Sequence, residues 1–284
     1  MQRTLARGSA REAAATAART ERPPRITLRS LLAGPGWVAN ALWAAAGIGL
    51  FVLIWTLIAR RLGNPVLLPT PAAVLEGFYQ LLVDGYLVQD VLASLKRVFA
   101  GFLIAAAIGV PLAMLLAYFL PLRRLVLPLV TLLRPIPPIA WIPIAILWFG
   151  IGDKPSFFIT AIAAFFPIFL NSFFGGTSVE EQHLNAARSL GAKKLSLLVR
   201  IMFPSALPMI WTGLKIGLGQ SWMAVVTAEL IAAQSGLGYM IQTSRLNLET
   251  SYVLVGMVTI GVLGSLMGLG LSGVERYVLP WKRK

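Results

Sequence analysis

Long apolar segments separated by polar or charged stretches dominate the pattern of this 284-residue chain. Each segment is long enough for an α-helix to cross a hydrocarbon layer about 30 Å thick. The pattern predicts six spans, at about 41–59, 98–120, 125–150, 155–174, 206–231 and 252–273. The expected fold is therefore all-α, a polytopic membrane protein with about six transmembrane helices and both termini on the same side.

The composition supports this interpretation and excludes several classes of site. Hydrophobic residues make up 57% of the chain and the mean hydropathy is +0.76, too apolar for an ordinary soluble domain. Cysteine is absent and His183 is the single histidine, so we expect no disulfide and no metal site. We interpret His183 as a solvated or capping side chain; the alternative is a pH sensor.

The charge distribution predicts the orientation of the spans. The formal net charge is +14, but the basic residues stand in short tracts beside apolar spans, which argues against nucleic-acid binding. Most of them lie in the two terminal segments, at residues 123–124 and in the loop before the fifth span. Because basic residues favour the cytoplasmic side, both termini and this loop are predicted to be cytoplasmic, although Arg60 and Arg61 run against the rule.

The first 35 residues form a separate region, rich in arginine and alanine and without the apolar core of a signal peptide. We interpret residues 1–35 as a basic cytoplasmic tail and residues 36–284 as the transmembrane domain. An organelle transit peptide is the alternative for the tail.

A polar, basic island at residues 185–204 interrupts the apolar pattern. Gly191 can adopt the left-handed conformation that ends a helix, and Pro204 stands where the fifth span would begin. Between them, apolar residues follow the spacing of one helix face, at Leu195, Leu198, Val199 and Met202. The pattern predicts a helix, a turn and a second helix over about 180–204, either as a docking element or as a plain amphipathic loop.

The third span carries four prolines, Pro135, Pro137, Pro138 and Pro143. Proline removes a backbone donor, so the helix must break, and in lipid a break is tolerated where protein or water satisfies the freed carbonyls. The broken segment is therefore predicted to line a translocation pathway, with a packing kink as the alternative.

Charged residues within the spans mark further candidates, because an ionised group at the bilayer centre costs about 2.5–3.5 kcal/mol by insertion scales. Arg134 and Lys215 could attract an anion; alternatively they reach the interface or pair with Glu229. Tryptophans in the spans are more often packing or interface residues than solute contacts. The candidate pathway residues are Arg134, Pro137, Pro138, Trp141, Lys215, Trp222 and Glu229.

No phosphate-binding GxxxxGK[ST] motif and no intramembrane catalytic group of histidine, serine, lysine or aspartate residues is present. The chain is therefore predicted to be a transport protein and not an enzyme, and ATP-driven transport would need a separate ATPase. A self-sufficient channel or secondary carrier remains the alternative, although no inverted repeat is visible.

The island also resembles the cytoplasmic coupling loop of ABC importer permeases, which reads Glu-Ala-Ala, three residues, Gly, nine residues, Ile-x-Leu-Pro. Here Asn185 replaces the glutamate and Phe203 the leucine, and we expect Asn185 to form only neutral hydrogen bonds. The residues that this resemblance places at the ATPase are Asn185, Ala186, Ala187, Arg188, Gly191, Lys193, Ile201 and Pro204.

Five further segments, LLPTP, SLKRVFAGF, LRPIPPIAWIPIAILWFGIG, AFFPIFLNS and AELIAAQSGLGYMI, resemble the nitrate, taurine, aliphatic-sulfonate and bicarbonate branch of these permeases. The resemblance implies the type I ABC importer permease fold, a homodimer in the bacterial inner membrane, and import of a small anion. It also implies ATPase subunits that bind ATP and Mg²⁺, and an external solute-binding protein.

Overall fold

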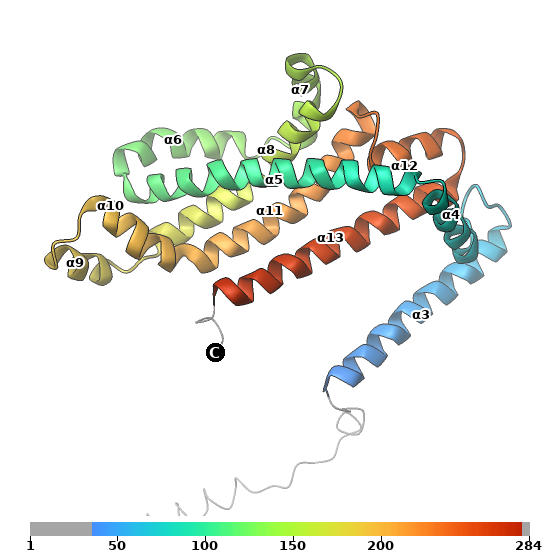
Figure 1. The fold of residues 1–284 in the computed structure, drawn as a ribbon, viewed down its shortest axis with the longest axis horizontal. Helices are drawn as coiled ribbons and strands as arrows, with labels where there is room; N and C mark the ends of the chain where they lie inside the picture. Colours follow the sequence, from blue (N-terminus) through green and yellow to red (C-terminus); the bar gives the residue numbers. More distant parts are fainter. Residues whose placement is uncertain (1–35, 280–284) are drawn as a thin grey trace, which may run out of the picture. The chain divides into compact units, whose positions relative to one another are not determined.

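The computed structural model describes residues 36–279, so the predicted basic tail at 1–35 lies outside the described residues. Within this range the chain is helical and has no strand. The elements are α3 (Gly36–Leu62), α4 (Pro71–Val83), α5 (Tyr86–Tyr118), α6 (Leu120–Leu133), the 3₁₀ turn η1 (Pro138–Trp141), α7 (Ile142–Phe149), α8 (Asp153–Thr177), α9 (Glu181–Ser189), α10 (Lys194–Leu197), the π-helical turn η2 (Leu198–Met202), α11 (Phe203–Ala232), α12 (Leu237–Leu246) and α13 (Thr250–Val278) (Figure 1).

Five helices in this range are long and apolar enough to cross a membrane, and a sixth span results if α6 and the η1–α7 segment are counted together. These two segments meet at an angle of 94°, which confirms the predicted break in the third span. The second span begins earlier than the hydropathy pattern predicts, at Tyr86 instead of residue 98. The pattern misplaced this start because Asp90 and Arg97 interrupt the apolar sequence; in the structure Asp90 bonds the Gly236 amide and Arg97 pairs with Glu229 and Asp153.

Helix α3 is apolar along its length and carries Arg60 and Arg61 in its last turn. Basic side chains at this end are favourable, because the carbonyl end of a helix carries partial negative charge. The two arginines that oppose the topology rule thus stand at a locally favourable helix end. The helix ends at Leu62, three residues after the predicted end of the span.

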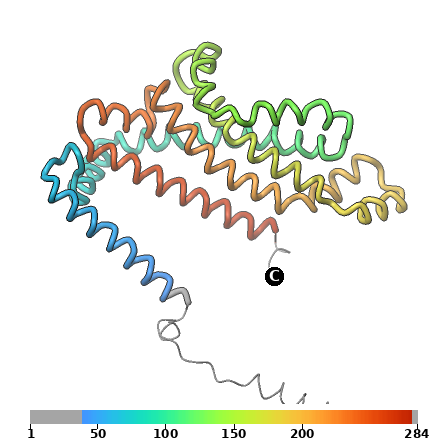
Figure 2. The backbone as a smooth tube through the Cα atoms, turned by 180° about the vertical axis from the view of Figure 1, so that it is seen from behind, coloured from blue at the N-terminus to red at the C-terminus, as the bar shows by residue number. Residues whose placement is uncertain are grey.

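Helices α5, α8 and α11 pack side by side and form the core of the part from Ala59 onwards (Figures 1 and 2). Small residues bring their backbones together: a Cβ atom on Gly213 of α11 would lie 3.0 Å from the Pro167 carbonyl oxygen of α8. Close packing of this kind stabilises membrane helices, which gain little from hydrophobic burial in lipid. Residues 180–204, the predicted helix, turn and helix that we name the coupling segment, lie at one end of α11, and the turn to α12 lies at the other end (Figure 1).

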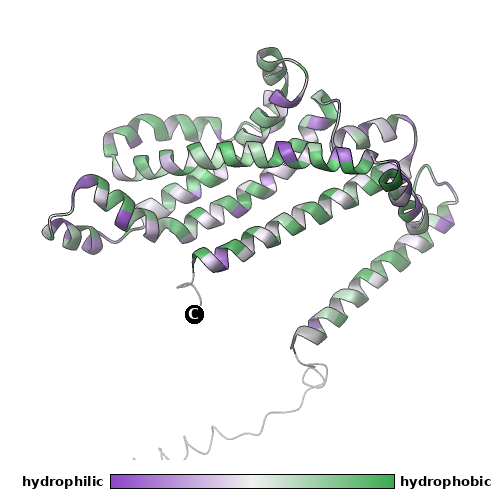
Figure 3. Cartoon of the chain, viewed as in Figure 1, coloured by the Kyte–Doolittle hydropathy of each residue, from purple (hydrophilic) through white to green (hydrophobic). Residues whose placement is uncertain are grey.

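The distribution of polar residues follows the same division. Hydrophilic residues are prominent around α9 and α10, whereas the long helices are mainly hydrophobic (Figure 3). Near α4, Tyr252 donates a hydrogen bond to Gln80 Oε1 at 3.0 Å, which ties the start of α13 to α4.

Candidate functional site

A cavity of about 420 Å³ lies where the third span breaks. Three elements form it: the segment between α6 and η1, the middle of α8, and α11. The lining residues are Arg134, Ile136, Pro138, Ala163, Phe166, Pro167, Leu170, Asn171, Phe174, Ile216 and Gln220. The cavity is thus mainly apolar, with a small set of polar side chains, which is the usual composition of a small-molecule site.

The polar side chains of this cavity differ in the hydrogen bonds that they make. Asn171 Nδ2 donates to the Pro167 carbonyl oxygen at 2.8 Å, so the amide is partly engaged by its own helix. Arg134 is exposed, and neither it nor Gln220 has a hydrogen bond or ion pair with its side chain among residues 39–279. A guanidinium with an amide beside it can bind an oxyanion through several N–H donors.

The structure brings two of the predicted pathway residues, Arg134 and Pro138, into this cavity. Pro137 precedes η1 in extended conformation. Trp141 follows at the end of η1, and its indole nitrogen is buried without a hydrogen-bond partner in the part of the chain that the structure describes.

The other three predicted pathway residues lie elsewhere. Lys215 forms an ion pair with Glu275 of α13, so its charge is compensated. Trp222 is buried and its Nε1 lies 3.2 Å from the Met267 sulfur atom, a contact that joins α11 to α13. The suggestion that Glu229 pairs with Arg134 or Lys215 is wrong, because its cationic partner is Arg97.

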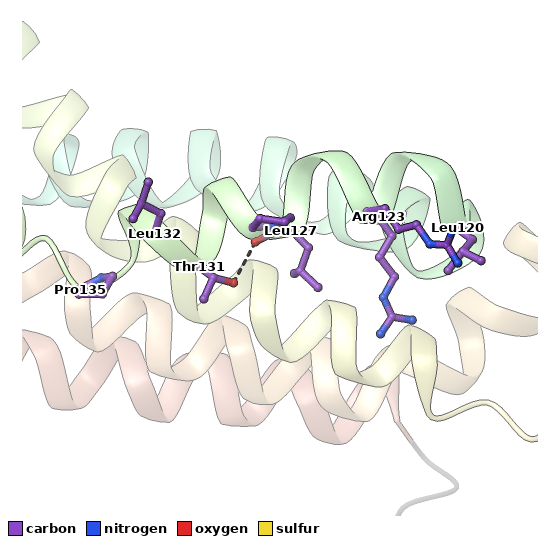
Figure 4. A pocket seen from close by; sticks show the side chains of 8 residues that line it. Leu120, Arg123, Leu127, Thr131, Leu132 and Pro135 are labelled. Carbon is purple, nitrogen blue, oxygen red and sulfur yellow. Dashed lines mark hydrogen bonds between the residues drawn. The ribbon is translucent and has the colours of Figure 1, made fainter.

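A larger hollow, of about 740 Å³, follows one face of α6. Its lining recurs every three or four residues along α6 and ends just beyond it, at Leu120, Arg123, Arg124, Leu127, Pro128, Thr131, Leu132 and Pro135 (Figure 4). Thr131 donates its hydroxyl hydrogen to the Leu127 carbonyl oxygen at 2.9 Å, so that donor is engaged by its own helix. The stripe is apolar beyond the two arginines, as is usual for a helix face that packs on lipid or on another helix.

An ion-pair network surrounds Arg97, whose side chain is only 2% exposed. Its Nη1 lies 2.7 Å from Glu229 Oε1, and its Nη2 lies 2.6 Å from Asp153 Oδ1. The same guanidinium donates to the carbonyl oxygen of Ser235 at 2.6 Å and to its hydroxyl at 2.8 Å. Glu229 is fully buried, whereas Asp153 is 40% exposed. One arginine thus joins α5, α8, α11 and the turn before α12.

Glu229, together with Ser94, which donates to it, and Asp90, also caps α12. Asp90 accepts from the Gly236 amide at 2.7 Å, Ser94 from the Leu237 amide at 2.9 Å, and Glu229 from the Gly238 amide at 2.9 Å. These are amides at the start of a helix, which have no partner within the helix itself. Negative charge at this position is also stabilised by the helix dipole. Three side chains from two other helices therefore fix the start of α12.

Sequence reasoning selected Glu229 and missed Asp90, Ser94, Arg97 and Asp153. A signal was present, because Asp90, Ser94 and Arg97 stand at i, i+4 and i+7, on one face of a helix. This polar stripe lies on a helix that otherwise reads as membrane-spanning, and in lipid such a stripe must face protein.

The coupling segment has the predicted helix, turn and helix, although the second helix is short. Gly191 has a φ of +81°, and the Ala192 amide donates to the Ala187 carbonyl oxygen at 3.0 Å, which ends α9 with the expected left-handed turn. α10 and the π-helical turn η2 then lead directly into α11, which has Pro204 in its first turn.

Two details of this segment differ from the prediction. Of the predicted stripe, Met202 is buried and Leu198 half-buried, whereas Leu195 and Val199 are exposed and Leu197 is buried instead, because the π-helical turn changes the helical register. Asn185 accepts a hydrogen bond from Arg188 Nη1 at 3.0 Å, so the expectation of only neutral hydrogen bonds at Asn185 is also wrong. The tip of the segment consequently presents apolar side chains outwards, with Leu190 89% exposed.

The remaining predicted coupling residues lie within this same segment. Ala186, Arg188 and Lys193 are exposed, Ala187 and Ile201 are half-buried, and all belong to the stretch between the ends of α8 and α11. The sequence prediction therefore marks one continuous structural element.

Comparison with known proteins gives consistent results. Residues 109–284 match the family described as binding-protein-dependent transport system inner membrane component. The chain is 36% identical over 237 residues to the taurine transport system permease protein of Escherichia coli K12, covering 82% of this chain and 86% of that protein. It is 31% identical over 249 residues to the nitrate import permease protein of Synechocystis, covering 84% and 90% respectively.

Among solved structures, the MetNI methionine ABC transporter in an inward-facing conformation has a chain with a similar fold. The TM-score is 0.62 at 22% identity, over 72% of this chain and 98% of that chain. The predicted type I importer permease fold is thereby confirmed.

Proposed function

Because the chain belongs to the family of binding-protein-dependent transport system inner membrane components, we propose that it forms the membrane pathway of an ATP-driven importer for a small oxyanion. Within this family it is the permease, a transport subunit and not an enzyme. Taurine and nitrate, for which two relatives are named, both carry a group in which negative charge is spread over several oxygen atoms.

The observation that supports an anion is Arg134 in the cavity at the broken span. Its charge has no acidic partner in the described part of the chain, whereas Lys215 is compensated by Glu275. Because no acidic side chain among the described residues competes for it, the Arg134 guanidinium can donate several N–H groups to an oxyanion. Gln220 and Asn171 add neutral donors that hold an anion without opposing charge.

The coupling segment supports the proposal of a separate ATPase. Leu190, Leu195 and Val199 are exposed apolar side chains on a polar segment that connects two spans. Burial of these side chains against a partner protein would stabilise the complex. In this proposal ATP and Mg²⁺ bind to the ATPase subunits, and the segment transmits their closure to α8 and α11, which it joins.

The proposed assembly contains a second copy of this chain, so that the two cavities face a shared pathway. The basic coupling side of the chain is cytoplasmic, and both termini lie on that side of the bacterial inner membrane. The opposite side, which includes the start of α12, receives the anion from an external solute-binding protein.

Gly191→Val tests the role of the coupling segment. At a φ of +81° a β-branched residue is strained, by about 1–2 kcal/mol or more, so the turn after α9 should change shape. We expect the complex with the ATPase to assemble but to hydrolyse ATP without a matching rate of uptake, as measured in proteoliposomes.

Gly191→Asn is the matched control, because asparagine tolerates the left-handed region and a Cβ at this position meets no other atom within 4 Å. It should keep the wild-type ratio of uptake to ATP hydrolysis. A Gly191→Val complex that remains fully coupled would contradict the assignment of this segment.

A further inference from the structure

A separate cavity of about 450 Å³, with a polar lining, lies between the coupling segment and the helical bundle. The corner between α5 and α6 and the end of α8 form one side of it, and α9, α10 and η2 form the other. Leu120, Leu184 and Met202 contribute apolar walls. Three cationic side chains line the cavity, Arg123 from the bundle and Arg188 and Lys194 from the coupling segment, against one carboxylate, Glu181.

The three cations have no acidic partner among the described residues. Arg188 donates to Asn185, a neutral acceptor, and the Arg123 guanidinium lies 5.0 Å from the centre of the Phe173 ring. Lys194 makes no hydrogen bond or ion pair with its side chain in residues 39–279. The stacking on Phe173 fixes Arg123 on the bundle side, since the ring face attracts the cation.

This arrangement places like charges on both sides of one space. Helix α9 has no fully buried residue, and no side-chain hydrogen bond joins it to the bundle in the described range. Repulsion between Arg123 on one side and Arg188 and Lys194 on the other opposes close packing of the segment. An anion between them would remove the repulsion and accept hydrogen bonds from both sides.

We propose that this cavity binds an oxyanion that fastens the coupling segment to the bundle. The cytoplasmic location of this site rests on the proposed function. The existence of the site rests only on the side chains that line the cavity. Three basic side chains that converge from separate segments suit a phosphate group, which accepts charge-assisted hydrogen bonds on several oxygens. The phosphate group could belong to the headgroup of an anionic phospholipid, whose chains would lie along the apolar walls, or to a free phosphate ion.

The test uses the purified full-length chain and two arms that separate the sources. In detergent, inorganic phosphate is titrated at constant ionic strength against chloride, and the midpoint of thermal unfolding is recorded. In nanodiscs, the same midpoint is compared between phosphatidylcholine alone and phosphatidylcholine with phosphatidylglycerol. We expect a rise in one arm: the first would identify a free anion and the second a lipid headgroup.

The variants Arg123→Gln and Lys194→Gln should each weaken the apparent affinity for phosphate or anionic lipid, taken from the shift in unfolding midpoint, about tenfold. Each variant removes one charge-assisted hydrogen bond. Arg124→Gln is the matched control, since Arg124 is the adjacent exposed arginine and does not line this cavity. It removes the same charge and should keep the wild-type response. Lys194 is exposed, so its variant tests the proposal even if loss of Arg123 impairs folding.

No stabilisation in either arm would overturn the proposal, as would an equal loss in all three variants, which indicates nonspecific attraction. Neither arm contains an ATPase. Failure of ATP-coupled uptake with intact phosphate or lipid response would therefore count against the proposed function alone.

Discussion

Arg97→Met is expected to prevent accumulation of stable protein, or to lower the midpoint of thermal unfolding by many degrees. The substitution leaves Glu229 buried without its cation and removes the partner of Asp153. Loss of one member of a buried ion pair costs about 3–5 kcal/mol, a large part of the roughly 5–15 kcal/mol by which proteins are stable. Fluorescence-detected chromatography and thermal unfolding in detergent measure both effects.

The double variant Arg97→Met with Glu229→Gln separates the cost of an unpaired buried charge from the loss of the arginine side chain itself. It removes the buried negative charge, while the glutamine oxygen can still accept from the amide of Gly238. We expect it to be more stable than Arg97→Met alone. If Arg97→Met unfolds at the wild-type temperature, the network does not hold α5, α8, α11 and α12 together.

The second large effect is expected at Arg134. Arg134→Gln should lower anion uptake by at least about tenfold, because the variant loses one charge-assisted contact with the anion, while complex yield stays close to wild type. Arg134 is exposed and has no partner in the described residues, so the protein loses no internal contact. Uptake in proteoliposomes is measured per assembled complex.

Lys215→Gln provides the contrast within α11. The variant removes the ion pair between α11 and Glu275 of α13, so stability should fall, while uptake per assembled complex should change little. Sequence reasoning placed both basic residues in the pathway, and the ion pair is the reason to separate them. Wild-type uptake in Arg134→Gln, or equal losses per complex in both variants, would contradict the cavity as an anion site.

Short sequence patterns correctly predicted those features of the fold that are set by neighbouring residues. Prolines predicted the break of the third span, because a proline lacks a backbone donor whatever its tertiary surroundings. Gly191 predicted the left-handed turn, and Pro204 predicted the start of α11. Each of these conclusions depends on a few neighbouring residues.

The partners of charged residues could not be predicted in the same way. Arg97 contacts Asp153 and Glu229, which lie 56 and 132 positions away in the sequence. These distances carry no periodic signal, so a single sequence shows that a charge needs a partner but not which partner it finds. The register change in η2 was missed for a related reason, since apolar spacing assumes a regular α-helix throughout.

A chain that forms the pathway of an ATP-driven oxyanion importer should transport only as part of a complete complex. The direct test is uptake of nitrate and of taurine by proteoliposomes that contain this chain with its ATPase and its solute-binding protein. We expect accumulation that requires ATP at the ATPase together with all three components. Accumulation by this chain alone, driven by an ion gradient and independent of ATP, would contradict it and identify a secondary carrier.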